Sequence, residues 1–426
     1  MSVSDSLASR DPETTDLSAD APPAREQIAK VRFWRNSGWF NALLILVAIY
    51  LFVGAINLMG SGLKTMARVP ETEAWLHYLF SYARHPVAGL CIGVLITALV
   101  QSSSFTTCFV VGLVASPVTG MSLAVAIPII MGANIGTSVT NTLVSLAHLR
   151  RRKEFQRSLA GALVHDIFNV LNAALLLPLE IAFGLISRPA KWFADWLEGA
   201  AFFTANPKQF NVVKTAVSPL TDGADGLLSG VLGLSPTVAG ALTAIAAVAL
   251  LFCALIMLVR MLQGLMRDRL AGLFQRTLFR NKWIAFVVGI LITATVQSSS
   301  VTTSLIVPMV GAGVLTLKQI YPYTLGANIG TTITAILAGL AAAAMAGGQA
   351  ETVQFLAAAG LAVAFGHLLF NIIGTCIFWP LSWIPISLAK GYAKLAARRR
   401  LLAGMYIVVI FFLVPLVVIF AVRWLG

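Results

Sequence analysis

Residues 93–107 read GVLITALVQSSSFTT and residues 289–303 read GILITATVQSSSVTT, with twelve of fifteen positions identical. Similarity of this length within one chain indicates an internal duplication. Each copy places a glutamine, three serines and two threonines inside an apolar stretch. The pair therefore predicts both the architecture and the position of a functional site.

Two further matches extend the duplication. GANIGTSVT begins at Gly132 and GANIGTTIT begins at Gly326, at nearly the same distance from each QSSS motif. A fainter match aligns three later residues of the first copy with three of the second, namely His165, Phe168 and Asn169 with His367, Phe370 and Asn371. The repeat unit is therefore about 150 residues, with residues 401–425 as an extra helix.

The composition indicates an integral membrane protein. Hydrophobic residues make up 58% of the chain and charged residues only 11%. The apolar residues form runs of membrane-spanning length, which predicts helices and excludes soluble enzymes and outer-membrane barrels. Runs of about thirty residues that contain Gly, Pro or Ser clusters could each hold a re-entrant hairpin plus a crossing, so the number of crossings stays open.

The net charge of +13 does not indicate nucleic-acid binding, because Lys and Arg cluster between apolar runs as the positive-inside rule requires. In the first repeat the loop after the second matched element holds five basic residues, namely Arg150, Arg151, Arg152, Lys153 and Arg157. Its counterpart, residues 341–354, has none. Equivalent loops are therefore expected on opposite sides of the membrane. Inverted repeats of this kind are typical of transporters with a site at the midplane, the alternative being a duplication kept only for packing.

These patterns predict an all-α polytopic membrane protein with two inverted-topology repeats, each with a re-entrant helical hairpin and broken helices. The expected divisions are a disordered cytoplasmic tail (1–37), a first transmembrane repeat (38–186), an extracytoplasmic linker (187–235), a second repeat (236–388), and a basic linker with a C-terminal transmembrane helix (389–426). Basic residues just before residue 38 place the N-terminus in the cytoplasm.

The polar clusters predict a binding site rather than packing alone. Serines bond to nearby backbone and interrupt helices, so each helix should break at QSSS. A broken helix exposes N–H groups that suit an anion and carbonyls that suit a small hard cation. The alternative, hydrogen-bond glue between helices, explains one cluster better than two at matched spacing. Asn134 and Asn328 should add amide oxygens in the same layer, beside small residues that allow close helix packing.

The charge inventory restricts what can bind. Residues 86–147 contain no charged side chain and residues 284–340 contain only Lys318, so an anion there would meet almost no side-chain cation. A bare multivalent anion is costly in the membrane, and cations should travel with it. Asp166, whose counterpart is Leu368, is expected to hold a cation or a proton. The alternative is a structural carboxylate bonded to His165 or facing Arg157.

Other chemistry has no support in the sequence. His165 and His367 are expected to be hydrogen-bonding core residues, because no Cys or His partners lie at metal-ligand spacing. No nucleotide-binding or nucleophile motif is present, so ATP-driven transport, enzymatic hydrolysis and a bound cofactor are not expected.

The motifs GVLITALVQSSSFTT with GANIGTSVTN, and GILITATVQSSSVTT with TLGANIGTTITAIL, closely resemble the type II sodium-phosphate cotransporter family over roughly residues 40–386. The resemblance implies re-entrant hairpins whose tips coordinate inorganic phosphate and sodium. It implies phosphate contacts from Gln101, Ser102, Ser103, Ser104, Ser298 and Ser299. It implies one sodium site from Gln297, Ser298, Thr331 and Thr334, with further sodium binding at Asp166 and Asn169 as in electrogenic members. Supporting roles are expected for Asn134, Asn328, Thr106, Thr302 and Asn371.

The chain also departs from the animal members, because its linker lacks cysteines and the sequence has no Asn-x-Ser/Thr sequon. It looks like a bacterial homologue in the inner membrane. The expected function is sodium-coupled, electrogenic uptake of inorganic phosphate by alternating access, with phosphate, sodium and the lipid bilayer as partners and sodium as co-substrate. Alternatives are transport of another oxyanion, phosphate export, or a membrane scaffold without transport activity.

Overall fold

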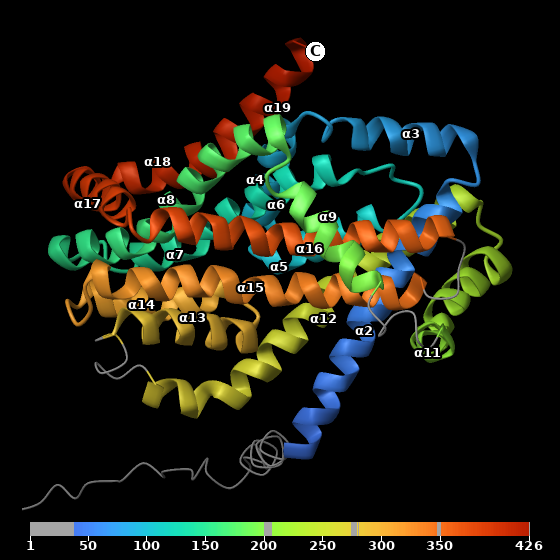
Figure 1. The fold of residues 1–426 in the computed structure, drawn as a ribbon, viewed down its shortest axis with the longest axis horizontal. Helices are drawn as coiled ribbons and strands as arrows, with labels where there is room; N and C mark the ends of the chain where they lie inside the picture. The colour runs from blue at the N-terminus through green and yellow to red at the C-terminus, as the bar shows by residue number, and fades with distance from the viewer. Residues whose placement is uncertain (1–37, 200–206, 274–278, 280, 347–350, 426) are drawn as a thin grey trace, which may run out of the picture. The chain divides into compact units, whose positions relative to one another are not determined.

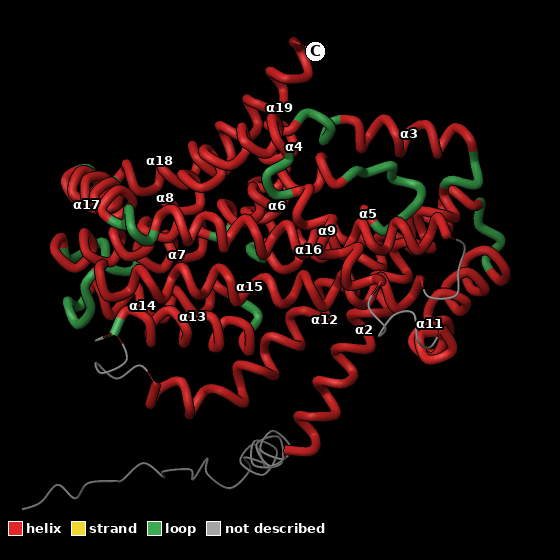
Figure 2. Tube along the Cα trace, viewed as in Figure 1, coloured by secondary structure: helices red, strands yellow, loops and turns green. Residues whose placement is uncertain are grey.

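The structure is a computed structural model that describes residues 38–199, 207–273, 279, 281–346 and 351–425. It divides into two compact units, residues 1–44 and 45–426, and all contacts discussed below lie within the second. No β-strand occurs among the described residues, as Figures 1 and 2 show. Seven helices in this part of the chain are long and apolar enough to cross a membrane. The chain is therefore an all-helical, multi-pass membrane protein.

Two helical hairpins carry the QSSS motifs. The first consists of α4 and α5 and the second of α13 and α14, with the bounds α4 Pro86–Val100, α5 Ser103–Val114, α13 Lys282–Val296 and α14 Ser299–Gly311. Within each hairpin two threonine hydroxyls nine residues apart are bonded, Thr97 to Thr106 at 2.8 Å and Thr293 to Thr302 at 2.9 Å. Nine residues of straight helix would separate such groups by about 13 Å, so the chain reverses at each motif. The predicted helix break is present in both copies.

Further helices of each repeat surround its hairpin. In the first repeat they are α2 Gly38–Met66, α6 Leu123–Gly136, α7 Ser138–Leu146 and α8 Arg152–Phe183. In the second they are α12 Pro236–Leu273, α15 Leu317–Ala346 and α16 Glu351–Phe378. The two repeats differ locally, because the first is interrupted at Thr137 where the second continues as α15. Figure 1 shows α13 and α14 lying along α15.

Glycines of the repeated motifs let these helices approach closely. A Cβ at Gly93 on α4 would collide with the backbone carbonyl of Ile129 on α6, and one at Gly132 would collide with that of Leu90. The second repeat has the same arrangement, in which Gly289 and Gly326 bring α13 against α15. Only glycine permits this backbone contact, which explains why the glycines are identical in both copies. It also holds each QSSS hairpin rigidly against its GANIG helix.

The remaining helices include several that the sequence patterns did not resolve. The region expected as a linker contains α9 Ser187–Gly199, α11 Pro207–Asp225 and the π-helical turn η1 Gly226–Val231. Short helices also flank the core, α3 Pro70–Ser81 and α17 Trp383–Arg398, and α17 runs across the expected boundary at residue 388. The extra C-terminal helix is α18 Leu401–Val408, η3 Val409–Leu413 and α19 Val414–Leu425. The N-terminal tail expected at 1–37 lies outside the described residues.

The second helix of each hairpin packs into its own apolar core. Phe105 and Val111 of α5 belong to a cluster that includes residues of α2, α12 and α15. Ile306 and Val310 of α14 belong to a cluster built on α8, α13, α15 and α17. These cores bury the apolar sides of the hairpins. The polar turns are thereby held in defined positions.

Candidate functional site

The turn in each hairpin has the same unusual backbone. Gln101 and Gln297 have φ of 59° and 56°, and they are the two non-glycine residues with positive φ in the described part of the chain. Each ends its helix by donating its N–H to the carbonyl four residues earlier, at 2.7 Å to Thr97 and 2.6 Å to Thr293. A left-handed conformation is uncommon for glutamine and costs free energy. Its presence at both motifs indicates that the surrounding structure holds both turns in this conformation, which makes them candidates for a functional role.

The serines that follow begin the next helices. Ser102 and Ser298 are in extended conformation, and their hydroxyls accept hydrogen bonds from Phe105 N at 3.2 Å and Val301 N at 3.4 Å. This is N-terminal capping, and it leaves the other N–H groups of the first turn available. The N-termini of α5 and α14 are therefore suited to an anion.

The two turns meet in space although they are far apart in sequence. The hydroxyl of Ser104 in the first motif donates to the backbone carbonyl of Gln297 in the second at 3.1 Å, and this contact is buried. A second link joins the repeats, because Asn141 of α7 exchanges hydrogen bonds with Thr303 of α14 at 2.8 and 3.0 Å. The structure thus brings the QSSS motifs of both repeats into contact. Asn141 was missed by the sequence reasoning, although it follows directly on GANIGTSVT.

The two glutamine side chains have different environments. Both polar atoms of the Gln101 amide are hydrogen-bonded, because its nitrogen donates to the Ala98 carbonyl and its oxygen accepts from Thr140 at 2.8 Å. In contrast, the Oε1 atom of Gln297 is buried and has no hydrogen-bond partner among the described residues. The sequence symmetry of the turns is therefore broken in the structure. An unsatisfied buried oxygen favours a nearby cation or donor.

Among the sodium ligands implied by the resemblance, some side-chain oxygens are hydrogen-bonded and others are not. Thr331 donates its hydroxyl to the Ala327 carbonyl at 2.9 Å, within its own helix. The Thr334 hydroxyl is buried and, within the part of the chain that the structure describes, has no partner. Thr334 also lies at the contact between repeats, where its carbonyl accepts from the Cys108 thiol at 3.7 Å. Two of the four implied ligands, Gln297 and Thr334, thus carry an unsatisfied buried oxygen.

The asparagines and histidines of the other matched motifs form a group of hydrogen bonds, most of which join the two repeats. His165 of α8 contacts the Asn328 amide oxygen at 2.6 Å, and His367 of α16 contacts that of Asn134 at 3.3 Å. Asn328 donates to Asn169 at 2.9 Å, and Asn169 donates to the Asn134 carbonyl at 3.2 Å. Each histidine therefore pairs with the asparagine of the opposite repeat. This agrees with the interpretation of the histidines as hydrogen-bonding core residues.

The expected supporting residues fall into two groups. Thr106 and Thr302 are buried and form the hydroxyl pairs that close the hairpins. Asn371 is also buried but donates within its own helix, to the His367 carbonyl at 3.0 Å. The threonines therefore contribute directly to the geometry of the QSSS turns, whereas the Asn371 side chain bonds to the backbone of α16.

Asp166 is buried and contacts a residue that the sequence reasoning missed. Its Oδ2 atom accepts a hydrogen bond from the phenol of Tyr406 in α18, while its Oδ1 atom has no partner among the described residues. The structural alternative that pairs Asp166 with His165 is not observed, since the His165 ring nitrogens contact Ser138 and Asn328. Tyr406 is the one tyrosine in the final apolar run, which was its only signal in the sequence.

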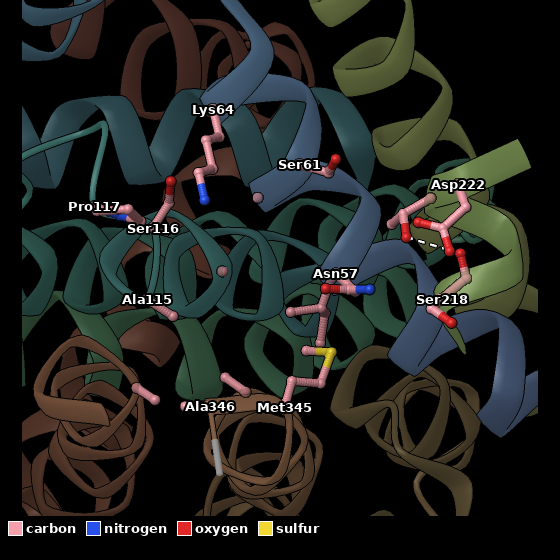
Figure 3. A pocket seen from close by; sticks show the side chains of 16 residues that line it. Asn57, Ser61, Lys64, Ala115, Ser116, Pro117, Ser218, Asp222, Met345 and Ala346 are labelled. Carbon is pink, nitrogen blue, oxygen red and sulfur yellow. Dashed lines mark hydrogen bonds between the residues drawn. The ribbon is translucent and has the colours of Figure 1, made fainter. Parts of the chain in front are cut away.

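A cavity of about 420 Å³ opens at the far end of α5, away from the QSSS turn. Its walls include a polar stripe on α2 made of Asn57, Ser61 and Lys64, spaced so that they share one helix face. In Figure 3 Lys64 and Ser116 point into the cavity from one side and Asp222 of α11 lies at the other. The Ser116 hydroxyl is buried without a partner in the described part of the chain. The cavity therefore offers polar groups of both charges beside the helix that carries the first motif.

Comparison with known proteins was informative. The sequence profile of the family described as Na+/Pi-cotransporter matches residues 51–193 and 250–379. Sodium-dependent phosphate transport protein 2B of Bos taurus is 32% identical over 457 residues, covering 88% of this chain and 64% of that protein. Protein 2A of Rattus norvegicus is 33% identical over 439 residues, covering 87% and 66%. The chain thus spans just under two thirds of the length of these relatives. No solved structure gives a significant match.

Proposed function

We propose, since this chain belongs to the family described as Na+/Pi-cotransporter, that it is a sodium-coupled symporter that takes up inorganic phosphate across the cell membrane. The relatives at 32 and 33% identity are sodium-dependent phosphate transport proteins. The observation that carries the proposal is the contact between the two QSSS turns through Ser104 and Gln297. It joins two capped helix N-termini, one from each repeat, into a single anion site.

Phosphate is held mainly by neutral donors in this proposal. The N–H groups at the starts of α5 and α14 point toward the turns, and the hydroxyls of Ser102, Ser103, Ser298 and Ser299 add donors. Helix N-termini favour negative charge, and several well-placed donors replace the hydration of an oxyanion. Little side-chain charge is available from the hairpins themselves, as the sequence of residues 86–147 shows. Sodium supplies the missing positive charge.

Sodium is held by oxygen atoms next to this anion site. The unsatisfied Oε1 of Gln297 and hydroxyl of Thr334 are the first candidates, since hard cations prefer oxygen ligands. Both atoms are buried, so leaving them empty is costly. A cation there would satisfy them and offset the charge of phosphate. This mutual compensation is the physical basis for coupling the two solutes.

The hairpins are re-entrant in this proposal. α4 and α13 each have 15 residues, and α5 and α14 have 12 and 13. Helices of this length reach about 18 to 23 Å, which is less than the hydrocarbon thickness of about 30 Å. Each hairpin therefore enters the membrane and returns to the same side. The basic residues of one loop and their absence from its counterpart support entry from opposite sides, as alternating access between inverted repeats requires.

Asp166 makes the transport electrogenic in this proposal. One of its carboxylate oxygens is bonded to Tyr406, and the other, which has no hydrogen-bond partner among the described residues, would bind the cation. Asn169 lies one helical turn further along the same helix. Because the second repeat has Leu368 at the equivalent position, this site has no symmetric copy. A further sodium bound here would move net charge with each phosphate.

Uptake of labelled phosphate into proteoliposomes tests the proposal. Wild-type protein is expected to accumulate phosphate only when sodium is higher outside. Ser298→Ala should reduce uptake at least tenfold, because it removes both a cap and a phosphate donor. Thr295→Val is the matched control, since the exposed Thr295 hydroxyl bonds only within its own helix. Equal accumulation with potassium, or with a proton gradient alone, would exclude sodium coupling.

A further inference from the structure

A second cavity, of about 560 Å³, lies at the end of α14 that is farthest from its QSSS turn. Three basic side chains line it, Arg157 of α8 with Lys390 and Lys394 of α17, and none of the described lining residues is acidic. The apolar part of the wall includes Ala160 and Val310. The three side chains are exposed, so solvent weakens their mutual repulsion, and an anion between them would remove what remains. This arrangement therefore needs an explanation beyond packing.

Local structure holds the three cations in place. α17 packs along α8, and its contact face is made of small buried residues, namely Ala389, Ala393, Ala396 and Ala397. Lys390 and Lys394 lie one turn apart on α17 and both line the cavity. Arg157 rests on the turn at Gly313, where φ is 78° and a Cβ would lie 2.5 Å from its Nη1 atom. A glycine at this position thus makes room for the guanidinium.

None of the three cations is neutralised by a carboxylate in the described part of the chain. The salt bridges found there are Arg151 with Glu154 and Lys191 with Asp195, and neither involves the cavity. The N-terminus of α15 lies at the same cavity, since Leu317 lines its wall. The positive end of this 30-residue helix adds to the three side-chain charges. These positive groups gather on one side of the cavity, with no described carboxylate paired to them.

We propose that this cavity binds a phosphate group, carried either by an anionic lipid headgroup or by free inorganic phosphate. Arg157 supplies a planar donor pair for two phosphate oxygens, and Lys390 and Lys394 supply point charges. The site is distinct from the QSSS site, because the 13 residues of α14 separate the two by about 20 Å. This site does not depend on which solute is transported, so it can be tested independently of the proposed function.

The cavity also has room beside the cations. Its volume exceeds what a single small anion needs and lies within the range of sites for larger ligands. The walls near Val310 and Leu315 are apolar, which suits the glycerol and upper acyl region of a lipid. Basic pockets between membrane helices commonly hold phosphate headgroups. The simpler alternative is that these residues serve only as positive charges at the membrane surface.

A comparison of two variants with the same change in charge distinguishes a phosphate-binding site from a general effect of surface charge. The test variant is Arg157→Gln with Lys390→Gln and Lys394→Gln, and the control is Arg150→Gln with Arg152→Gln and Lys153→Gln. Both remove three exposed charges, but the control residues do not line the cavity. A surface-charge effect would affect both variants alike. A site in the cavity would affect only the first.

The assay measures binding in detergent and in sodium-free potassium buffer. One arm titrates phosphatidylglycerol against phosphatidylcholine by native mass spectrometry, and the other titrates inorganic phosphate by thermal shift. Wild-type protein should bind in at least one arm. Each removed charge should lower the affinity about fivefold, so the cavity variant should lose on the order of a hundredfold. The control variant should stay within about twofold. The arm that responds identifies the source of the phosphate group.

Three results would overturn the proposal, two from the triple variants and wild-type protein and one from a single variant. One is that wild-type protein binds neither phosphatidylglycerol nor phosphate in excess of its controls. Another is that the cavity and loop variants lose affinity equally in every arm. The single exchange Lys394→Gln covers the case in which the triple variant fails to fold, because this side chain is exposed. It should lower affinity about fivefold on its own, and an unchanged affinity would also contradict the site.

Discussion

Replacing Ser104 by alanine tests whether the two QSSS turns act as one site. The Ser104 hydroxyl donates to the Gln297 carbonyl at 3.1 Å, in a buried contact between residues 193 positions apart. The equivalent serine of the second motif is Ser300, which is buried to a similar extent. The structure gives no hydrogen bond from the Ser300 hydroxyl to the first motif among the described residues. The two exchanges are therefore matched in chemistry and burial but differ in the cross-repeat bond.

The magnitude follows from the carbonyl that is left behind. Ser104→Ala removes the donor and leaves the Gln297 oxygen without it, at a cost of about 1–3 kcal/mol for a buried acceptor. That cost falls only on the arrangement in which the two turns touch. If phosphate binding requires this arrangement, KM for phosphate should rise about 5- to 150-fold. Ser300→Ala should change KM by less than about threefold.

Sodium-dependent phosphate uptake in proteoliposomes provides KM, and thermal unfolding of phosphate-free protein separates two causes. Loss of the bridge should lower Tm of Ser104→Ala even without phosphate, whereas loss of a direct phosphate contact should leave that Tm unchanged. Ser300→Ala serves as the reference in both measurements. Equal KM values for the two variants would refute the view that the Ser104 bond assembles the site.

Two other predictions concern the charge carried in transport and the orientation of the repeats. Asp166→Gly should keep sodium-dependent uptake but abolish net current, because it removes the one carboxylate among the repeated motifs. If the ratio of charge to phosphate is unchanged, Asp166 is instead a structural partner of Tyr406. Single cysteines at Arg151 and Gly347 should react with an impermeant reagent from opposite sides of the membrane, and labelling from one side would remove the argument for inverted repeats. Gly347 lies outside the described residues, so this second prediction comes from loop charge alone.

Much of the local structure could be predicted from the sequence, because it depends on residues close together in the chain. The helix breaks at QSSS follow from serine capping, which involves groups three residues apart such as Ser102 and Phe105. The apolar runs predict membrane helices for the same reason, since the lipid forces each segment to satisfy its own backbone. The glycines of the repeats predict close helix packing. Each of these inferences uses one segment at a time.

The helices of the linker could not be predicted in the same way. α9 and α11 lie in a stretch that was expected only as a connection. Their sequences mix polar and apolar residues, so they do not stand out as membrane spans. Contacts with α16 and α15 accompany these helices in the structure. Helices of this length are marginal alone and depend on such packing.

From the sequence alone it follows that this chain is a duplicated helical membrane protein with two polar turns of matched composition. Which side chains surround the candidate site depends instead on how the two repeats pack against each other. Ser104 with Gln297, His165 with Asn328 and Asp166 with Tyr406 are 193, 163 and 240 positions apart. Packing between the repeats also determines that the Gln101 amide oxygen has a hydrogen-bond partner, whereas that of Gln297 has none among the described residues. Identical local sequences receive different roles because packing between repeats, which no short segment encodes, decides which polar atoms find partners.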